Sequence, residues 1–290
     1  MPEINEPVKL LIEPAELADW RGDRPPVIVD TRSPAEYAES HIPGAVNIHD
    51  VFTYLAASTP EGIAAMREHF AEVFGSAGID GSDTVVFYED GMGTGFGQSC
   101  RGHFMLAYLG HENSLVLHGG LRAWRAEGRP VTDIVPQTKP RTLELNDNGL
   151  GMIVGKDDVL SEIGKDRVTF LDVRDVDEWI GESSSPYGKD FVPRKGRIPG
   201  AKWLEWYRMM KTSGGVSRMK SPDEVRAECH NIGLDFDKPI WLYCFKGART
   251  SNTYVALKQA GFTNISTYFG SWNEWARDES LPIEEGLPTG

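Results

Sequence analysis

Short apolar runs alternate along the chain with segments in which apolar residues recur at helical spacing. The runs at residues 27–29, 85–88, 169–171 and 240–243 have the length and β-branched or aromatic content of buried strands. Helical spacing follows in residues 104–109 and 254–260, which end at Gly110 and Gly261, both typical helix stops. This alternation predicts an α/β fold with parallel sheets covered by helices on both faces.

The pattern occurs twice. Asp30-Thr31-Arg32 and the run 41–45 (HIPGA) return as Asp172-Val173-Arg174 and 197–201 (RIPGA), at offsets of 142 and 156 residues. The strand-like run ending at Glu89 matches the one ending at Cys244, and Gly-Gly-Leu-Arg-Ala-Trp at 119–124 matches Gly-Ser-Trp-Asn-Glu-Trp at 270–275. Four anchors in the same order predict two homologous domains, at residues 1–135 and 151–290, joined by a Pro-, Thr- and Asn-rich linker at 136–150. The second copy has 14 extra residues, around 181–196.

Composition narrows the classes of function. Hydrophobic residues make up 40% and charged residues 25%, as in ordinary soluble proteins, and the apolar runs are too short to span a bilayer. A net charge of −13 argues against nucleic-acid and anionic-membrane partners. The acidic N-terminal residues lack the pattern of a secretory signal, so we expect a cytoplasmic protein. Three cysteines without paired spacing predict neither a disulfide framework nor a zinc site, and we expect no metal or organic cofactor.

Cys244 is the strongest candidate for chemistry. It ends a predicted strand and is followed by a short loop and a predicted helix from Thr250. Such a loop aims backbone N–H groups and the positive end of the helix dipole at one point, and Lys246 and Arg249 add positive charge. A cysteine there is expected to be largely thiolate at neutral pH and reactive. The alternative is a packed structural cysteine beside solvated cations, but two cations at a helix N-terminus favour an anionic ligand.

Other motifs have less support. Residues 91–97 (GMGTGFG) fit no dinucleotide-binding spacing, and a flexible loop facing the partner domain is favoured. Cys100 and Cys229 fall in predicted helices and are expected to pack in the core. Structural ion pairs are expected for the two Asp-x-Arg motifs, although Arg174 remains a candidate for binding substrate.

Together, these motifs resemble the tandem-domain rhodaneses, the thiosulfate and 3-mercaptopyruvate sulfurtransferases, from about residue 8 to 282. The resemblance implies that Cys244 carries sulfur as a persulfide and that the N-terminal domain, with Glu89 at the matching position, is non-catalytic. It also implies that the loop binds the substrate through six residues: Phe245, Lys246, Gly247, Ala248, Arg249 and Thr250.

Loop length and charge refine the resemblance. Four residues separate Cys244 from Arg249, whereas the related phosphatases and arsenate reductases use five. The loop Cys-Phe-Lys-Gly-Ala-Arg is similar to that of bacterial thiosulfate-type enzymes, and Glu178 stands where an arginine usually grips the carboxylate of mercaptopyruvate. Basic residues in and just after the extra stretch are candidates to replace that arginine: Lys189, Arg194, Lys195, Arg197 and Lys202. The alternative is that they form a solvated basic surface.

The resulting hypothesis is a double displacement. The Cys244 thiolate takes sulfane sulfur from thiosulfate or a similar small anionic donor, and a thiophilic acceptor then removes it. Cyanide would serve as acceptor in vitro, and a thiol, dithiol or sulfur-carrier protein in the cell. The alternatives are a 3-mercaptopyruvate sulfurtransferase, a cysteine phosphatase or arsenate reductase, which the loop length disfavours, and a non-catalytic sulfur-relay or regulatory module.

Overall fold

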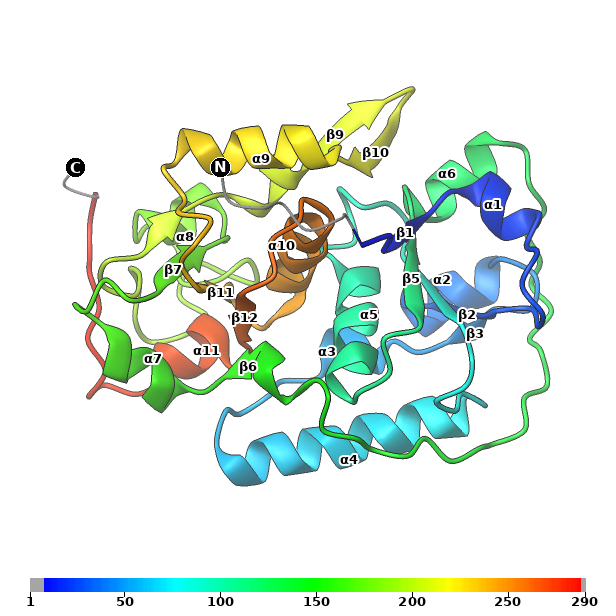
Figure 1. The fold of residues 1–290 in the computed structure, drawn as a ribbon, viewed down its shortest axis with the longest axis horizontal. Helices are drawn as coiled ribbons and strands as arrows, with labels where there is room; N and C mark the ends of the chain where they lie inside the picture. The colour runs from blue at the N-terminus through cyan, green and yellow to red at the C-terminus, as the bar shows by residue number, and fades with distance from the viewer. Residues whose placement is uncertain (1–7, 288–290) are drawn as a thin grey trace.

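The computed structural model describes residues 8–287, which form two halves that each contain a five-stranded parallel sheet (Figure 1). The N-terminal sheet has the order β1-β5-β4-β2-β3. Its strands are β1 (Leu11–Ile12), β2 (Val27–Asp30), β3 (Val46–Asn47), β4 (Val85–Tyr88) and β5 (Ser114–Leu117).

The C-terminal sheet has the order β6-β12-β11-β7-β8, which is the N-terminal order strand for strand. Its strands are β6 (Ile153–Val154), β7 (Thr169–Asp172), β8 (Lys202–Trp203), β11 (Ile240–Tyr243) and β12 (Ile265–Tyr268). Strand β4 therefore corresponds to β11. The predicted duplication and the α/β fold with parallel sheets are confirmed.

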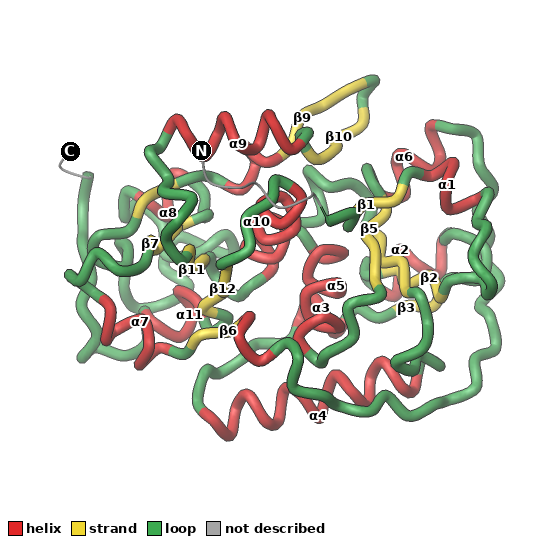
Figure 2. The backbone as a smooth tube through the Cα atoms, in the orientation of Figure 1, coloured by secondary structure: helices red, strands yellow, loops and turns green. Residues whose placement is uncertain are grey.

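Helices surround each sheet (Figure 2). Those of the N-terminal half are α1 (Pro14–Ala18), α2 (Pro34–Glu39), α3 (Asp50–Thr53), α4 (Pro60–Ser76), α5 (Gln98–Tyr108) and α6 (Gly120–Ala126). Those of the C-terminal half are α7 (Lys156–Glu162), α8 (Val176–Trp179), α9 (Pro222–Asn231), α10 (Ala248–Gln259) and α11 (Ser271–Trp275), with 3₁₀ turns η1 (Leu150–Met152) and η2 (Trp206–Met209). An antiparallel hairpin, β9 (Met210–Ser213) and β10 (Val216–Met219), has no counterpart in the part of the N-terminal half that the structure describes.

Local sequence explains where several helices begin. The side chains of Ser33 and Ser221 each accept a hydrogen bond from the backbone N–H of the residue three positions later, Glu36 or Glu224. The side chain of that glutamate in turn accepts from the backbone N–H of the serine, which completes a capping box at the start of α2 and of α9. Proline occupies the first turn of α2, α4 and α9, where its missing N–H costs no helical hydrogen bond. Helices α5 and α10 end just before Gly110 and Gly261, as predicted, and both glycines have positive φ.

The repeated Asp-x-Arg and Ile-Pro-Gly-Ala motifs form one buried structure in each half. In the C-terminal half, Asp172 pairs with Arg174 at 2.5 Å, and Arg174 also donates to the carbonyl oxygen of Gly196. The Tyr243 hydroxyl accepts from the N–H of Ile198 in the second motif. The N-terminal half repeats this arrangement with the corresponding residues: Asp30, Arg32, Ser40, Tyr88 and Ile42. Both predicted structural ion pairs are confirmed.

Helices α5 and α10 pack against each other between the two sheets (Figure 1). The ring of Phe104 on α5 meets Tyr254 on α10 edge-on at 5.1 Å and stacks on Phe269 at 5.5 Å. One hydrophobic core therefore runs across the boundary between the halves. Cys100 on α5 and Cys229 on α9 are buried in this core, as predicted.

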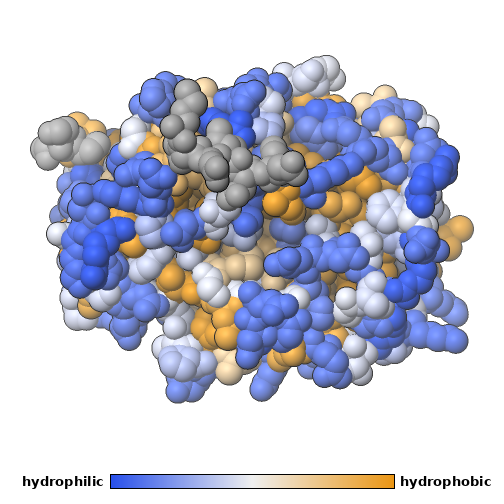
Figure 3. All heavy atoms as spheres, in the orientation of Figure 1, coloured by the Kyte–Doolittle hydropathy of each residue, from blue (hydrophilic) through white to orange (hydrophobic). Residues whose placement is uncertain are grey.

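The segment between the halves contains no helix or strand from residue 136 to 149. It runs alongside α4, where the backbone N–H of Arg141 donates to the carbonyl of Gly75 (Figure 1). The face shown in Figure 3 is covered mainly by hydrophilic side chains, with apolar ones between them. Within residues 8–287, no helix is both long and apolar enough to cross a membrane.

Candidate active site

Cys244 lies directly after β11, at the carboxyl end of the strand and the N-terminus of α10. The N–H of Gly247 donates to its Sγ at 3.1 Å. Gly247 has φ +95°, and a Cβ there would approach the ring of Phe269 to 2.8 Å, so only glycine fits this turn. The loop thus brings the sulfur to the positive end of a 12-residue helix, as the sequence predicted.

Three carbonyl groups of the loop accept hydrogen bonds from the helices α10 and α11. The carbonyls of Cys244 and Phe245 accept from the N–H groups of Trp272 and Asn273, at the start of α11. The carbonyl of Gly247 accepts from the hydroxyls of Thr250 and Ser251 on α10. Thr250 therefore shapes the loop.

Several backbone N–H groups of the loop remain available. Those of Phe245, Lys246 and Ala248 donate to no other residue in the described part of the chain. This arrangement is suited to binding an anion beside Cys244.

A cavity of about 370 Å³ opens onto Cys244 between the two halves. Its walls include four aromatic side chains and come from the N-terminal half, the extra stretch and the loop. The lining residues are Phe52, Thr94, Phe96, Gln98, Pro186, Tyr187, Cys244, Phe245, Lys246, Ala248 and Arg249. The glycine-rich loop 91–97 thus faces the C-terminal half, as predicted, and its Phe96 stacks on Trp206 at 5.8 Å.

Lys246 is the cation of the loop that has no ion-pair partner among the described residues. Its Nζ lies 4.1 Å from the ring centre of Phe52 and 4.9 Å from that of Tyr187. Burial, together with the nearby charge of Arg101, lowers the pKa of Lys246 to about 8, although the negative charge of Cys244 acts in the opposite direction. Aromatic faces stabilise the ammonium group and leave its charge available to an anion.

Arg249 is paired with carboxylates. Its guanidinium is bound by Glu178 through two hydrogen bonds of 2.5 and 3.1 Å, and Asp175 lies 3.2 Å away. The pair is buried, and the pKa of Arg249 is raised: burial alone would lower it, but Glu178 outweighs burial. Glu178 neutralises much of the positive charge that Arg249 was expected to add to the loop, and Arg249 still lines the cavity.

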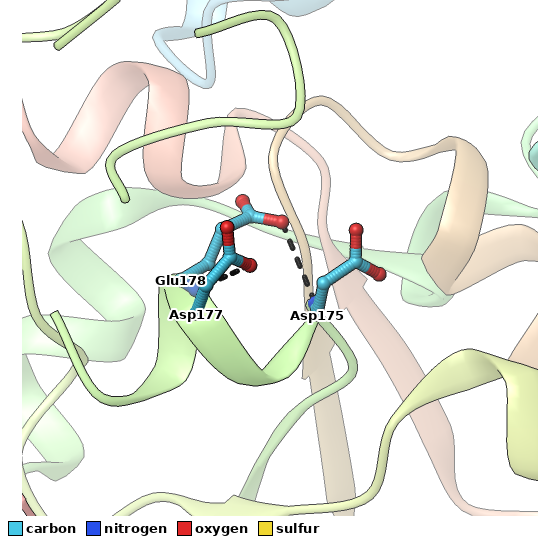
Figure 4. Close-up of side chains that lie close together, drawn as sticks. All are labelled: Asp175, Asp177 and Glu178. Carbon is cyan, nitrogen blue, oxygen red and sulfur yellow. Dashed lines mark hydrogen bonds between the residues drawn. The ribbon is translucent and has the colours of Figure 1, made fainter. Parts of the chain in front are cut away.

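Glu178 belongs to a group of three carboxylates with Asp175 and Asp177, shown in Figure 4 on and beside α8. Their oxygens lie within 4.8 Å of one another, close enough to hold a cation. The guanidinium of Arg249 is the cation that this group binds, since it contacts two of the three carboxylates.

The four further candidates do not line this cavity. Arg174 is held by Asp172 with its guanidinium over the ring of Trp272. Arg194 donates to the carbonyl oxygens of Trp275, Ala276, Asp278 and Leu281, and Lys195 pairs with Asp190. Arg197 pairs with Glu284 and donates to the carbonyl of Gly286. These side chains stabilise the fold of the C-terminal half, and the geometry does not support their binding substrate.

The sequence pattern did not predict the aromatic side chains of the cavity or the contribution of the N-terminal half. Phe52 and Phe96 come from that half, and Tyr187 comes from the extra stretch, which has no counterpart to compare with. Arg101, on α5, was also missed. It is an arginine in a helix of apolar and small residues with no acidic residue three or four positions away, a pattern that could have drawn attention to it.

Glu89 occupies the position of Cys244 in the N-terminal half. The carbonyls of Glu89 and Asp90 accept from the N–H groups of Leu121 and Arg122, just as the Cys244 loop is held by α11. Glu89 Oε2 accepts from the N–H of Ser99 at the start of α5. The carboxyl group therefore lies where the second copy has its sulfur. Complete burial raises its pKa from 4.5 to about 7.

We expect the variant Glu89→Gln to be more stable than the parent protein at pH 8. Because the folded-state pKa of Glu89 is raised from 4.5 to about 7, the folded state binds a proton more tightly, so stability falls as pH rises through this range. At about 1.4 kcal/mol per pKa unit, the neutral amide should gain at most roughly 3 kcal/mol above pH 7 and little at pH 4.5. Urea unfolding at both pH values measures this, with the exposed Glu68→Gln as control. An equal effect of Glu89→Gln at both pH values would contradict the shifted titration.

Comparison with known proteins agrees with the duplicated fold. The model of the rhodanese-like domain family matches residues 13–127 and again residues 156–278. A thiosulfate sulfurtransferase of Azotobacter vinelandii is 31% identical over 277 residues, covering 95% of this chain and 97% of that protein. The sulfur carrier protein TtuD of Thermus thermophilus is 31% identical, covering 86% of this chain and 87% of its own.

Solved structures show the same fold. The anaerobic ergothioneine biosynthesis enzyme of Chlorobium limicola, in complex with trimethyl histidine, superposes with a TM-score of 0.80 at 25% identity. The match covers 96% of this chain and 71% of that one.

Proposed function

The chain belongs to the rhodanese family and is a sulfurtransferase of the rhodanese type, and from this premise we propose that it moves sulfane sulfur from thiosulfate to a thiophilic acceptor through a persulfide on Cys244. The observation that carries the proposal is the position of Cys244 Sγ. It accepts the N–H of Gly247 at the N-terminus of α10 and opens onto a cavity that also holds the ammonium group of Lys246. We assign the catalytic role to the C-terminal domain, residues 151–290. We assign no catalytic role to Glu89, which occupies the position of Cys244 in the N-terminal domain.

In the first step the Cys244 thiolate attacks the outer sulfur of thiosulfate. A new S–S bond forms to Cys244, the S–S bond of thiosulfate breaks, and its electron pair leaves with sulfite. The leaving group gains negative charge near the free N–H groups of the loop and near Lys246, which stabilise it. No proton needs to move if Cys244 starts as thiolate.

In the second step a nucleophile attacks the terminal sulfur of the persulfide. With cyanide, a C–S bond forms, thiocyanate leaves, and the electron pair of the S–S bond returns to Cys244 as thiolate. A thiol, a dithiol or a sulfur-carrier protein would react at the same sulfur. The similarity to a protein named as a sulfur carrier supports a protein acceptor. A cytoplasmic location is part of the proposal, because the cycle needs a reduced thiol.

Charge around the cavity supports thiosulfate over 3-mercaptopyruvate as the donor. Glu178 binds Arg249, so this arginine is not available as a free partner for the carboxylate of 3-mercaptopyruvate. Lys246 remains as the loop cation without an ion-pair partner among the described residues, which suits a small dianion with no separate carboxylate to fix. A relay module without turnover is the second candidate, and the thiocyanate assay distinguishes it.

We expect thiosulfate and cyanide to give thiocyanate with the parent protein and with Cys229→Ala, a buried cysteine on α9, while Cys244→Ser gives none above background. With 3-mercaptopyruvate as donor, kcat/KM should be at least about tenfold lower, because the carboxylate lacks a free arginine. Equal yields from Cys244→Ser and the parent would overturn the proposal. A higher kcat/KM for 3-mercaptopyruvate would overturn the choice of donor.

A further inference from the structure

Arg101 lies on α5 in the N-terminal domain and is fully buried, with 0% of its surface exposed. Its Nη1 donates to the carbonyl of Phe52 at 3.0 Å and its Nη2 to that of Tyr54 at 2.8 Å. Its guanidinium carbon is 4.8 Å from the centre of the Phe269 ring. These contacts hold the guanidinium in one place without giving it a negative partner.

Arg101 differs in this respect from three other buried arginines. Arg32, Arg174 and Arg249 each form an ion pair with a buried carboxylate. Within residues 8–287 no carboxylate pairs with Arg101, and its buried Nε has no hydrogen-bond partner. A buried guanidinium without a counter-ion costs several kcal/mol, so another anion is expected nearby.

Two contacts connect Arg101 to the Cys244 loop. Phe269, under its guanidinium, packs against Gly247, whose N–H binds Cys244 Sγ. Phe52, whose carbonyl Arg101 binds, places its ring 4.1 Å from the Nζ of Lys246. Arg101 is thus one side chain away from the loop at two points.

The charges agree with this placement. Burial lowers the pKa of Arg101 to about 10, and the negative charge of Cys244 opposes that shift. After burial itself, the charge of Arg101 is the main cause of the lowered pKa of Lys246. Both directions agree with a placement of Arg101 near Lys246 and Cys244 in a poorly solvated region.

We propose that Arg101 is a positioning residue of the sulfur-transfer site, holding the backbone at Phe52 and Tyr54 and placing a buried positive charge that favours the anionic forms of Cys244. The inference rests on the proposed function in taking Cys244 as the reactive sulfur. Through Arg101, the domain without the nucleophile contributes the counter-charge for the thiolate and, after the first step, for the persulfide.

The test is the pH dependence of alkylation of Cys244 by iodoacetamide, followed by mass spectrometry of the peptide that contains it. In Arg101→Gln, which keeps a hydrogen-bond donor but loses the charge, the half-maximal pH should rise by about one unit, so that at pH values below both midpoints the reaction is roughly tenfold slower. Arg101→Lys should restore most of the difference. Arg67→Met should leave the profile unchanged, since Arg67 lies on α4, binds the carbonyl of Asn146 and does not line the cavity.

A folded Arg101→Gln protein with the parent profile would overturn the proposal, as would a profile of Arg101→Lys displaced as far as that of Arg101→Gln. Circular dichroism establishes folding, and Arg101→Met provides a second neutral variant if the first does not fold. Because alkylation needs no sulfur donor, this result is independent of persulfide formation. A parent protein that alkylates as described but takes no sulfur from thiosulfate would overturn the proposed function alone.

Discussion

Lys246→Met should lower kcat/KM for thiosulfate roughly a hundredfold, the usual effect of removing one group that stabilises developing negative charge. The ammonium of Lys246 lies against the rings of Phe52 and Tyr187 and lines the cavity that opens onto Cys244. Arg249 cannot replace it, because Glu178 already binds the guanidinium. Methionine is nearly the same length and keeps the packing against the rings, so the loss should reflect the charge.

The pH profile gives this prediction a sharper form. The pKa of Lys246 is lowered to about 8, so its positive charge is present below that pH and lost as the pH rises through it. Since kcat/KM reports the ionisation of the free enzyme, it should fall for the parent protein as pH rises above about 8. Lys246→Arg should retain its activity there, because a guanidinium keeps its proton.

Steady-state rates between pH 6 and 10, on the order of one measurement per half unit, would resolve the alkaline limb. A parent protein and a Lys246→Arg variant with the same alkaline fall would contradict the role of Lys246. So would a Lys246→Met variant with undiminished kcat/KM.

The second large effect is expected from Glu178→Gln. Removing the negative charge leaves Arg249 with Asp175 alone and makes the cavity more positive by one unit. The KM for thiosulfate should fall about tenfold, the equivalent of roughly 1.4 kcal/mol. The same change should cost roughly 3 kcal/mol of stability, because it breaks a buried ion pair and leaves one partner behind.

Asp177→Asn is the matched control for this variant. Asp177 lies on the same helix, is exposed, and forms no ion pair with Arg249. It should change neither KM nor the urea midpoint by more than a small amount. An unchanged KM in a folded Glu178→Gln protein, or the same fall in KM in both variants, would show that the pair does not control anion binding.

The duplicated fold was predictable because each half repeats the constraints that its sheet requires. Strands buried on both faces leave continuous apolar runs, such as 85–88 and 240–243, and helices covering a sheet end at glycines such as Gly110 and Gly261. Cys244 could be singled out for the same reason, since its position after β11 follows from the local sequence.

What surrounds Cys244 could not be predicted, because it depends on contacts between residues distant in the chain. Glu178 and Arg249 are 71 residues apart and meet only when α8 and α10 are placed beside each other. One of the two rings that meet Lys246 comes from Phe52 in the other half. No local pattern distinguishes a free loop arginine from a paired one, so the pairing of Arg249 with Glu178 could not be predicted from the sequence.

The most direct test of the central claim is intact-protein mass spectrometry after incubation with thiosulfate. The parent protein should gain the mass of one sulfur atom, located on Cys244 by peptide mapping, and lose it on addition of cyanide with release of one equivalent of thiocyanate. Cys229→Ala should behave in the same way. A parent protein that gains no sulfur, or a Cys244→Ser variant that gains it equally, would contradict the account.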